Sequence, residues 1–173
     1  KYLYGYASSI FLLAKYVQDN NVLGIKIDCC FTTSEILTEH YRNVINNAFQ
    51  CQVMDCYGAR DGGVTAYKLD SENFFVAYNS FIETDNKNNI ISTDLFNYAF
   101  PFIRYKPGDQ IELAPSSTSW NGQLIKKVFG RSGDLIHLEN GSVLTGPGFT
   151  VLLKDINVKK YKIRKTNFME LTF

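Results

Sequence analysis

Apolar side chains recur at helical spacing early in the chain and in short β-prone runs farther on. A helix is predicted over residues 9–19, and Ser8 or Ser9 is placed to cap its first turn. Its apolar residues share one face of the helix: Ile10, Leu13, Ala14 and Val17. The apolar run at residues 23–31 then predicts a strand.

The next residues continue this order with a helix and a strand. A second helix is predicted over residues 35–49, with Ser34 as its candidate cap, and a strand over residues 52–57. The buried stripe of this helix consists of Leu37, Tyr41, Val44, Ile45 and Ala48. Short connections between strand, helix and strand predict a right-handed parallel crossover, and ligands of such sheets bind beyond the carboxyl ends of the strands. Ser34 and Tyr57 fall at such ends.

From residue 64 onward the pattern changes to short β-prone runs that are separated by Asn, Asp, Gly and Ser. These runs cover residues 64–69, 74–78, 90–93, 103–105, 123–128 and 134–137. They predict hairpins of an antiparallel or barrel-like subdomain, with a polar turn at residues 85–89. The expected fold class is α/β, a parallel β-α-β unit followed by mostly β structure. We expect one domain over residues 1–131, then a hinge and the beginning of a small domain, with a short helix at 149–156, over residues 132–173.

Composition indicates a folded chain whose charge does not select a partner. It has 173 residues, of which 45% are hydrophobic, enough to bury a sizeable core. Eighteen basic and 17 acidic residues leave a net charge of +1, too weak a bias to indicate nucleic acid or an anionic membrane. No apolar run approaches the length of a membrane span, and the first residues lack the layout of a signal peptide, so the cytoplasm is the expected compartment.

Three groups of residues invite a chemical role but have a simpler structural one. The four cysteines lack zinc spacing, and the two histidines lie apart, so we expect reduced thiols in the core. Five basic residues within 159–165 suit contact with phosphate or nucleic acid, but their alternation with apolar residues fits a half-exposed strand better. The aromatic residues are expected to serve core packing more than an aryl-acid pocket.

The strongest chemical signal is a carboxylate and a guanidinium in the second half of the chain. Gly108-Asp109 follows the aromatic run at residues 100–105, and Arg131 follows Gly130. A carboxylate accepts hydrogen bonds from both hydroxyls of a ribose, and an arginine supplies a forked donor for ribose or phosphate oxygens. A Gly-Asp pair alone is typical of a turn. Residues 56–63 add an aromatic ring, a glycine turn and another acid, and this combination favours ATP as the ligand.

Arg104 lies within the aromatic run and needs a partner where it is buried. We expect it to form an ion pair that positions the Asp109 loop, in preference to a direct contact with substrate.

Four segments resemble the adenylate-forming ligases, in particular the branch of phenylacetate-coenzyme A ligases and related proteins of capsular polysaccharide biosynthesis. They are Thr32-Thr33-Ser34-Glu35, Tyr57-Gly58-Ala59-Arg60-Asp61, Pro101-Phe102-Ile103-Arg104-Tyr105 with Gly108-Asp109, and Arg131-x-x-Asp134 followed by Gly141. The resemblance covers roughly residues 1–165. It implies that the chain is a fragment from the second half of such a ligase, with the adenylation fold of that family.

The resemblance implies how a nucleotide is bound. The backbone around Ser34 and Glu35 would line the adenine pocket, and the ring of Tyr57, followed by Gly58, would lie on adenine. The remaining contacts would come from two side chains that hold the ribose, Asp109 and Arg131.

It also implies roles for two further acids. Asp61 would help to hold Mg²⁺ where the family has glutamate. Asp134 would be the hinge about which the C-terminal domain rotates between half-reactions.

The implied reaction of the intact ligase uses ATP and Mg²⁺ to adenylate a small-molecule carboxylic acid and passes the acyl group to coenzyme A or another acceptor. The family's phosphate loop, expected upstream, and its catalytic lysine, expected downstream, have no counterpart here. We therefore expect this chain alone to be inactive and its partner to be the missing N-terminal half. The alternative is a nucleotide-binding or interaction module without catalysis, which Asp61 and the absent loop favour.

Overall fold

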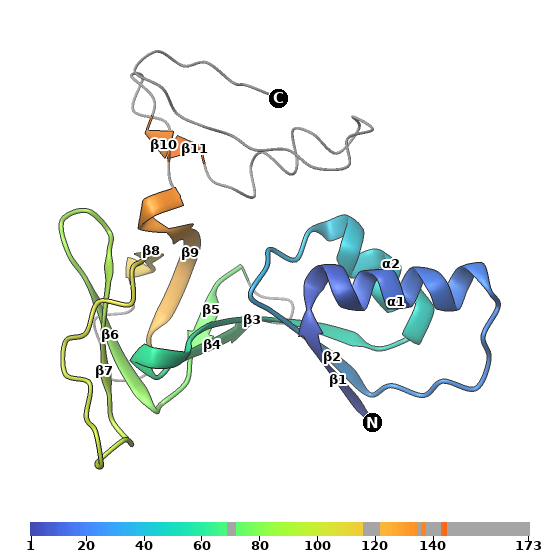
Figure 1. Cartoon of the computed structure of the whole chain (residues 1–173), viewed down its shortest axis with the longest axis horizontal. Helices are drawn as coiled ribbons and strands as arrows, with labels where there is room; N and C mark the ends of the chain where they lie inside the picture. The colour runs from blue at the N-terminus through green and yellow to red at the C-terminus, as the bar shows by residue number, and fades with distance from the viewer. Residues whose placement is uncertain (69–71, 116–121, 135, 138–142, 145–173) are drawn as a thin grey trace.

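The computed structural model describes residues 1–68, 72–115, 122–134, 136–137 and 143–144 (Figure 1). Strands β1 (Tyr2–Tyr6), β2 (Cys29–Thr33) and β3 (Gln52–Ala59) alternate with helices α1 (Ala7–Asp19) and α2 (Glu39–Phe49). Strands and short 3-10 turns follow: η1 (Arg60–Gly62), β4 (Val64–Lys68), β5 (Phe74–Val76), β6 (Ser80–Thr84), β7 (Ile90–Asp94), β8 (Asp109–Leu113), β9 (Leu124–Arg131), η3 (Ser132–Asp134), β10 (Ile136–His137) and β11 (Val143–Leu144).

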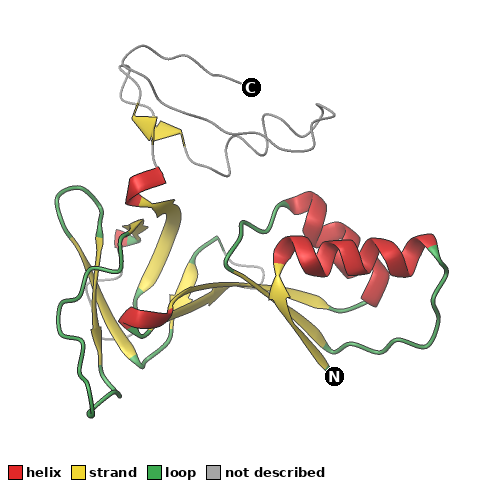
Figure 2. Ribbon diagram, in the orientation of Figure 1, coloured by secondary structure: helices red, strands yellow, loops and turns green. Residues whose placement is uncertain are grey.

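One seven-stranded sheet runs through the molecule in the order β1-β2-β3-β4-β5-β9-β8 (Figure 2). β1, β2 and β3 are parallel, whereas every later pair in this sheet is antiparallel. β6 pairs with β7 in a separate antiparallel hairpin, and β10 pairs with β11. The predicted α/β class, a parallel unit followed by antiparallel strands, is confirmed.

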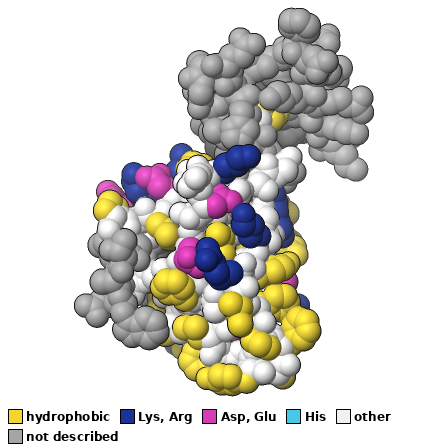
Figure 3. Space-filling model, turned by 90° about the vertical axis from the view of Figure 1, so that its left-hand side faces the viewer, with side chains coloured by type: hydrophobic (Ala, Val, Ile, Leu, Met, Phe, Trp, Pro, Cys, Tyr) yellow, Lys and Arg dark blue, Asp and Glu magenta, His cyan; other side chains and the backbone are white. Residues whose placement is uncertain are grey.

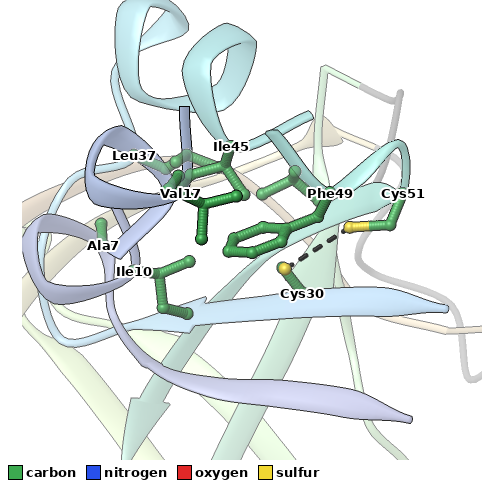
Figure 4. Close-up of a cluster of buried hydrophobic side chains, with 10 residues drawn as sticks. Ala7, Ile10, Val17, Cys30, Leu37, Ile45, Phe49 and Cys51 are labelled. Carbon is green, nitrogen blue, oxygen red and sulfur yellow. Dashed lines mark hydrogen bonds between the residues drawn. The ribbon is translucent and has the colours of Figure 1, made fainter. Parts of the chain in front are cut away.

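Both helices lie on one side of the parallel strands, at the opposite end of the molecule from the β6–β7 hairpin (Figure 1). They bury a compact core against β2 and β3 (Figure 4). Its buried members are Ala7, Ile10, Ala14, Val17, Cys30, Leu37, Ile45, Phe49, Cys51 and Val53. The rings of Phe11 and Tyr41 stack at 4.2 Å between the helices. This burial of apolar surface is what holds the helices to the sheet.

The cysteines of this lobe are free thiols, but the prediction that all four lie in the core is only partly correct, because Cys29 and Cys56 are half-buried. Cys30 and Cys51 are buried, and their Sγ atoms lie 3.4 Å apart. Burial, followed by the neighbouring thiol of Cys51, raises the pKa of Cys30, which disfavours the reactive thiolate.

The other face of β1 has no covering layer in the part of the chain that the structure describes. Tyr2, Tyr4 and Tyr6 alternate along the strand and are 71%, 75% and 56% exposed. Leu3 points to the opposite side, where it packs against the core.

Helix α1 begins earlier than predicted and is not capped by Ser8 or Ser9. Its N-cap is Tyr6, which makes no side-chain capping bond. A carboxylate from a distant segment takes that role instead, because the Ser8 backbone N–H donates to Glu35 Oε2 at 2.8 Å. Leu13, predicted to be buried, is 44% exposed because it lies beside the buried stripe and not within it.

The start of α2 also differs from the prediction. The helix begins at Glu39, because the Thr38 side chain accepts a hydrogen bond from the Tyr41 backbone N–H at 3.2 Å. Ser34 has a φ of 63°, a left-handed conformation that an N-cap does not adopt. The strand predicted over residues 23–31 begins only at Cys29, as β2, and Leu23 is 90% exposed.

The β half matches the predicted runs in part. β4, β5, β7 and β9 fall on four of them, and residues 85–89 form the turn of the β6–β7 hairpin. Strands β6, β8 and β11 were missed. The run at 103–105 forms only an isolated bridge between Ser92 and Tyr105, and the last run shortens to β10. The helix predicted at 149–156, the basic stretch at 159–165 and Gly141 lie outside the described residues.

The surface that carries the β6–β7 hairpin is divided by chemistry. Exposed hydrophobic side chains gather on its lower part, and basic side chains stand beside acidic ones above them (Figure 3). Among the described residues, no helix is long and apolar enough to cross a membrane.

Candidate functional site

Asp109 and Arg131 lie at the meeting ends of two paired strands. Asp109 begins β8, Arg131 ends β9, and the two are direct partners in the ladder. Arg131 Nε lies 3.3 Å from Asp109 Oδ1. Asp109 is only 7% exposed, so its carboxylate is a buried charge that needs partners.

The backbone on either side of Asp109 is fixed as well. Gly108 has a φ of 90°, a conformation that favours glycine. Arg131 Nη1 donates to the Pro107 carbonyl at 2.7 Å, and the Ser132 backbone N–H donates to the Gly108 carbonyl at 2.8 Å. The end of β9 therefore holds the loop that presents Asp109.

Tyr57 provides the second partner of the Asp109 carboxylate. Its hydroxyl donates to Asp109 Oδ2 at 2.7 Å. β3 and β8 are separated in the sheet by β4, β5 and β9, so the sheet must curl to bring these residues together. Burial and then the Asp109 charge raise the pKa of the Tyr57 phenol, which keeps its proton available for donation.

Asp61 and Tyr105 form a second carboxylate–phenol pair. The Tyr105 hydroxyl donates to Asp61 Oδ2 at 2.9 Å. This hydrogen bond, followed by desolvation, raises the pKa of Tyr105. Tyr105 is itself held to β7, because its backbone exchanges two hydrogen bonds of 2.8 Å with Ser92.

Two glycines let the Asp61 turn approach β7. A Cβ added at Gly62 would lie 2.6 Å from Ser92 Oγ, and one at Gly63 would lie 2.6 Å from Asp94 Oδ2. Gly63 also has a φ of 67°. The Gly-Gly sequence after Asp61 is thus explained by close packing against β7.

The two pairs belong to one group. The Arg131 charge opposes the rise in the pKa of both phenols, and the Asp61 charge adds to the rise in the pKa of Tyr57. We call this group the aspartate–tyrosine cluster; its members are Tyr57, Asp61, Tyr105, Asp109 and Arg131. Sequence reasoning missed only Tyr105, although it adjoins Arg104 in the aromatic run.

Among the described side chains of the other sequence-predicted site residues, those of Ser34 and Glu35 make no contact with the cluster. Ser34 follows β2 at the carboxyl edge of the parallel strands, which β3 shares. The Glu35 carboxylate is engaged by the start of α1. Gly58 lies in β3 opposite Thr65, and Asp134 is the last residue of η3, three positions after Arg131.

Arg104 does not form the predicted contact with the Asp109 loop. Its Nε lies 3.4 Å from Glu83 Oε2 on β6, where the Arg104 side chain is exposed and Glu83 is half-buried. Its φ of 52° turns the chain at this point, so the guanidinium leaves the aromatic run and reaches solvent.

Among the described residues, no three His, Cys, Asp or Glu side chains form a group suited to hold a metal ion. Mg²⁺ is often bound by one or two carboxylates, with water and substrate phosphates as the other ligands. Asp61 satisfies that smaller requirement, because Tyr105 engages only Oδ2 and Asp61 lies on an exposed turn.

No family model matches the chain. It is 29% identical over 159 residues to Protein CapK of Staphylococcus aureus, a match that covers 87% of the chain and 35% of CapK. The chain thus spans about a third of the length of this curated relative.

Solved structures of two ligases share the fold of this chain. An open conformation of 2-hydroxyisobutyryl-CoA ligase, in complex with 2-HIB-AMP and CoA, matches with a TM-score of 0.64 and 16% identity over 90% of this chain and 41% of the ligase. Coronafacic acid ligase from Pectobacterium brasiliense matches with a TM-score of 0.57 and 14% identity, over 91% of this chain and 35% of that one. The chain is therefore similar in sequence to CapK and has, over part of their length, the fold of the adenylate-forming, AMP-forming ligases.

Proposed function

We propose that this chain is the nucleotide-holding part of an ATP-dependent, AMP-forming ligase of carboxylic acids. The observation that carries the proposal is the buried Asp109 carboxylate, which Tyr57 and Arg131 hold from two sides. A cis-diol offers two hydroxyl donors, and a fixed carboxylate offers two acceptor oxygens. The bound 2-HIB-AMP of a ligase with the same fold supports the choice of an adenylate.

In the intact ligase, an oxygen of the substrate carboxylate attacks the α-phosphorus of ATP. The bond to the bridging oxygen of the β-phosphate breaks, pyrophosphate leaves, and an acyl-adenylate remains. A thiol then attacks the acyl carbon, and AMP leaves. Holding the ribose in both steps supplies positioning, which is a large part of catalysis in such reactions.

Residues of this chain would contribute in distinct ways. Asp109 and Arg131 hold the ribose, Tyr57 lies against the nucleoside, and the backbone after β2, around Ser34 and Glu35, borders the adenine. Mg²⁺ supplies charge neutralisation at the phosphates, and the free oxygen of Asp61 is the group suited to contact it.

The acyl acceptor and the domain motion belong to the same proposal. Coenzyme A is the acceptor that the bound CoA of 2-hydroxyisobutyryl-CoA ligase favours. Asp134, placed directly after the strand that carries Arg131, is the candidate hinge between residues 1–131 and residues 132–173. A role in capsular polysaccharide synthesis and a cytoplasmic location stay predictions.

A second function, nucleotide binding without catalysis, is favoured by Asp61 in place of glutamate. Release of pyrophosphate from ATP, measured with a polypeptide extended upstream of residue 1, distinguishes the two functions. Release that depends on a carboxylic acid supports the ligase, and binding without release supports the module.

Isothermal titration calorimetry with AMP tests the nucleotide site in the chain itself. We expect AMP to bind, and Asp109→Asn to weaken binding by at least about tenfold. Glu112→Gln is the matched control, because Glu112 lies on the same strand, its side chain is 40% exposed, and among the described residues it forms an ion pair with Lys126 and not with the cluster. Equal affinity of all three proteins would refute the assignment of Asp109 to the ribose.

A further inference from the structure

We propose that the Tyr57 hydroxyl positions the Asp109 carboxylate and thereby sets the preference of this site for nucleotides with a ribose diol. The inference rests on the proposed function and deepens it, because it assigns selectivity to a residue whose expected role was only to stack on adenine. Tyr57 acts through Asp109 and is therefore a positioning residue.

Among the described residues, the carboxylate has one polar partner on each oxygen. Tyr57 donates to Oδ2 at 2.7 Å, and Arg131 Nε lies 3.3 Å from Oδ1. Each carboxylate oxygen accepts about two hydrogen bonds, so the contacts with the described residues leave one acceptor position on each. Two open positions, one on each oxygen, match the two hydroxyls of a cis-diol.

The two partners differ in how firmly they hold the carboxylate. The Arg131 side chain is 63% exposed, whereas Tyr57 on β3 is half-buried and packs against the hydrophobic core of the β half. An exposed ion pair is weakened by water, but a hydrogen bond from a partly buried phenol to a buried carboxylate is protected from it. Tyr57 is thus the firmer of the two restraints on rotation of the carboxylate about χ2.

The phenol is also the appropriate kind of donor. It is uncharged, so it orients the carboxylate without neutralising it, and Asp109 keeps its capacity to accept from a diol. A phenol is protonated at physiological pH, and burial, which raises the pKa of Tyr57 further, is consistent with that state. A phenylalanine at this position retains the ring and loses only this restraint.

The test compares two nucleotides on two proteins. AMP and 2′,3′-dideoxy-AMP are titrated by calorimetry into the wild-type chain and into Tyr57→Phe. We expect the wild type to prefer AMP, and Tyr57→Phe to lower AMP affinity by about five- to tenfold. Binding of the dideoxy nucleotide should change less than about twofold, so the preference falls by nearly the full factor.

Tyr67→Phe is the matched control. Tyr67 lies on β4, paired with Cys56 next to Tyr57, and its ring contacts Phe75 and not the cluster. This variant removes a phenolic hydroxyl from the neighbouring strand and should keep the wild-type preference. The same two nucleotides are also titrated into Asp109→Asn and into the double variant Asp109→Asn, Tyr57→Phe. Without the carboxylate, Tyr57→Phe should leave the preference for AMP unchanged.

The outcomes separate this inference from the proposed function. An equal loss of affinity for both nucleotides would mean that Tyr57 acts through its ring or through folding, and would overturn the inference. An unchanged preference in Tyr57→Phe, while Asp109→Asn abolishes it, would overturn the inference alone. A wild type that binds neither nucleotide would overturn both.

Discussion

Arg131 and Asp109 are cross-strand partners whose side chains meet at 3.3 Å, and the same guanidinium also donates to the Pro107 carbonyl at 2.7 Å. One arginine therefore ties a carboxylate and its loop to the end of β9. Because the Arg131 side chain is 63% exposed, this ion pair contributes little to folding, and its value lies in arranging the site.

Arg131→Lys should separate the contribution of Arg131 to nucleotide binding from its contribution to folding stability. Lysine keeps the charge but cannot make the two forked contacts, so we expect AMP affinity to fall about tenfold while the free energy of unfolding changes by less than about 1 kcal/mol. Calorimetry and urea denaturation measure the two quantities. Arg104→Lys is the control, since Arg104 pairs with Glu83 outside the cluster and should leave AMP affinity as it was. A large loss of stability in Arg131→Lys would contradict the expectation.

Asp61→Asn should act on the metal and not on the nucleoside. The amide keeps a hydrogen-bond acceptor for the Tyr105 hydroxyl but loses the negative charge that a magnesium ion needs. We expect the gain in ATP affinity on adding MgCl₂ to shrink by at least about fivefold, with AMP binding in EDTA nearly constant. Titrations of ATP with and without magnesium measure this, and an undiminished gain would remove Asp61 from the metal site.

Local patterns were sufficient to predict the parallel crossover and most antiparallel strands, because apolar spacing in α2, β3 and β4 reflects burial directly. They also identified four members of the cluster. The capping of α1 by Glu35 could not be predicted from local patterns, because the contact joins positions 27 residues apart and replaces the local serine cap. β8 was missed because its sequence, Asp-Gln-Ile-Glu-Leu, is mostly polar and gains its place through pairing with β9.

The Tyr57–Asp109 bond was beyond sequence reasoning for a similar reason. It spans 52 residues and exists only because the sheet curls through three intervening strands. Sheet curvature is a property of the whole ladder, including the irregular register between β8 and β9, and no local pattern encodes it.

Gly63→Ala should destabilise the fold more than Gly24→Ala. Both glycines have positive φ, so each substitution carries a backbone cost of about 1 kcal/mol. Only the Cβ at Gly63 would collide with a neighbour, 2.6 Å from Asp94 Oδ2, whereas Gly24 has open space. We expect Gly63→Ala to cost about 2 kcal/mol or more in urea denaturation. Equal losses would show that Asp94 moves aside freely.

Asp55 provides a pH-dependent test of burial on β3. It is buried, with Lys68 Nζ 3.8 Å from Oδ2. Burial raises its pKa, although Lys68 and Arg42 oppose the shift. A carboxyl whose pKa is higher in the folded state stabilises the fold in acid, below its unfolded pKa, and loses that contribution as the pH rises through its folded pKa.

Asp55→Asn should therefore increase stability at pH 7, by roughly 1 kcal/mol, because the amide carries no charge to desolvate. The difference from the wild type should shrink as the pH falls below the folded pKa of Asp55, where the wild-type carboxyl is neutral as well. Urea denaturation of both proteins across this pH range measures the effect, and Glu112→Gln controls for loss of an exposed acid. A wild type that is more stable than Asp55→Asn at pH 7 would mean that the attraction of Lys68 outweighs the cost of burial at this position.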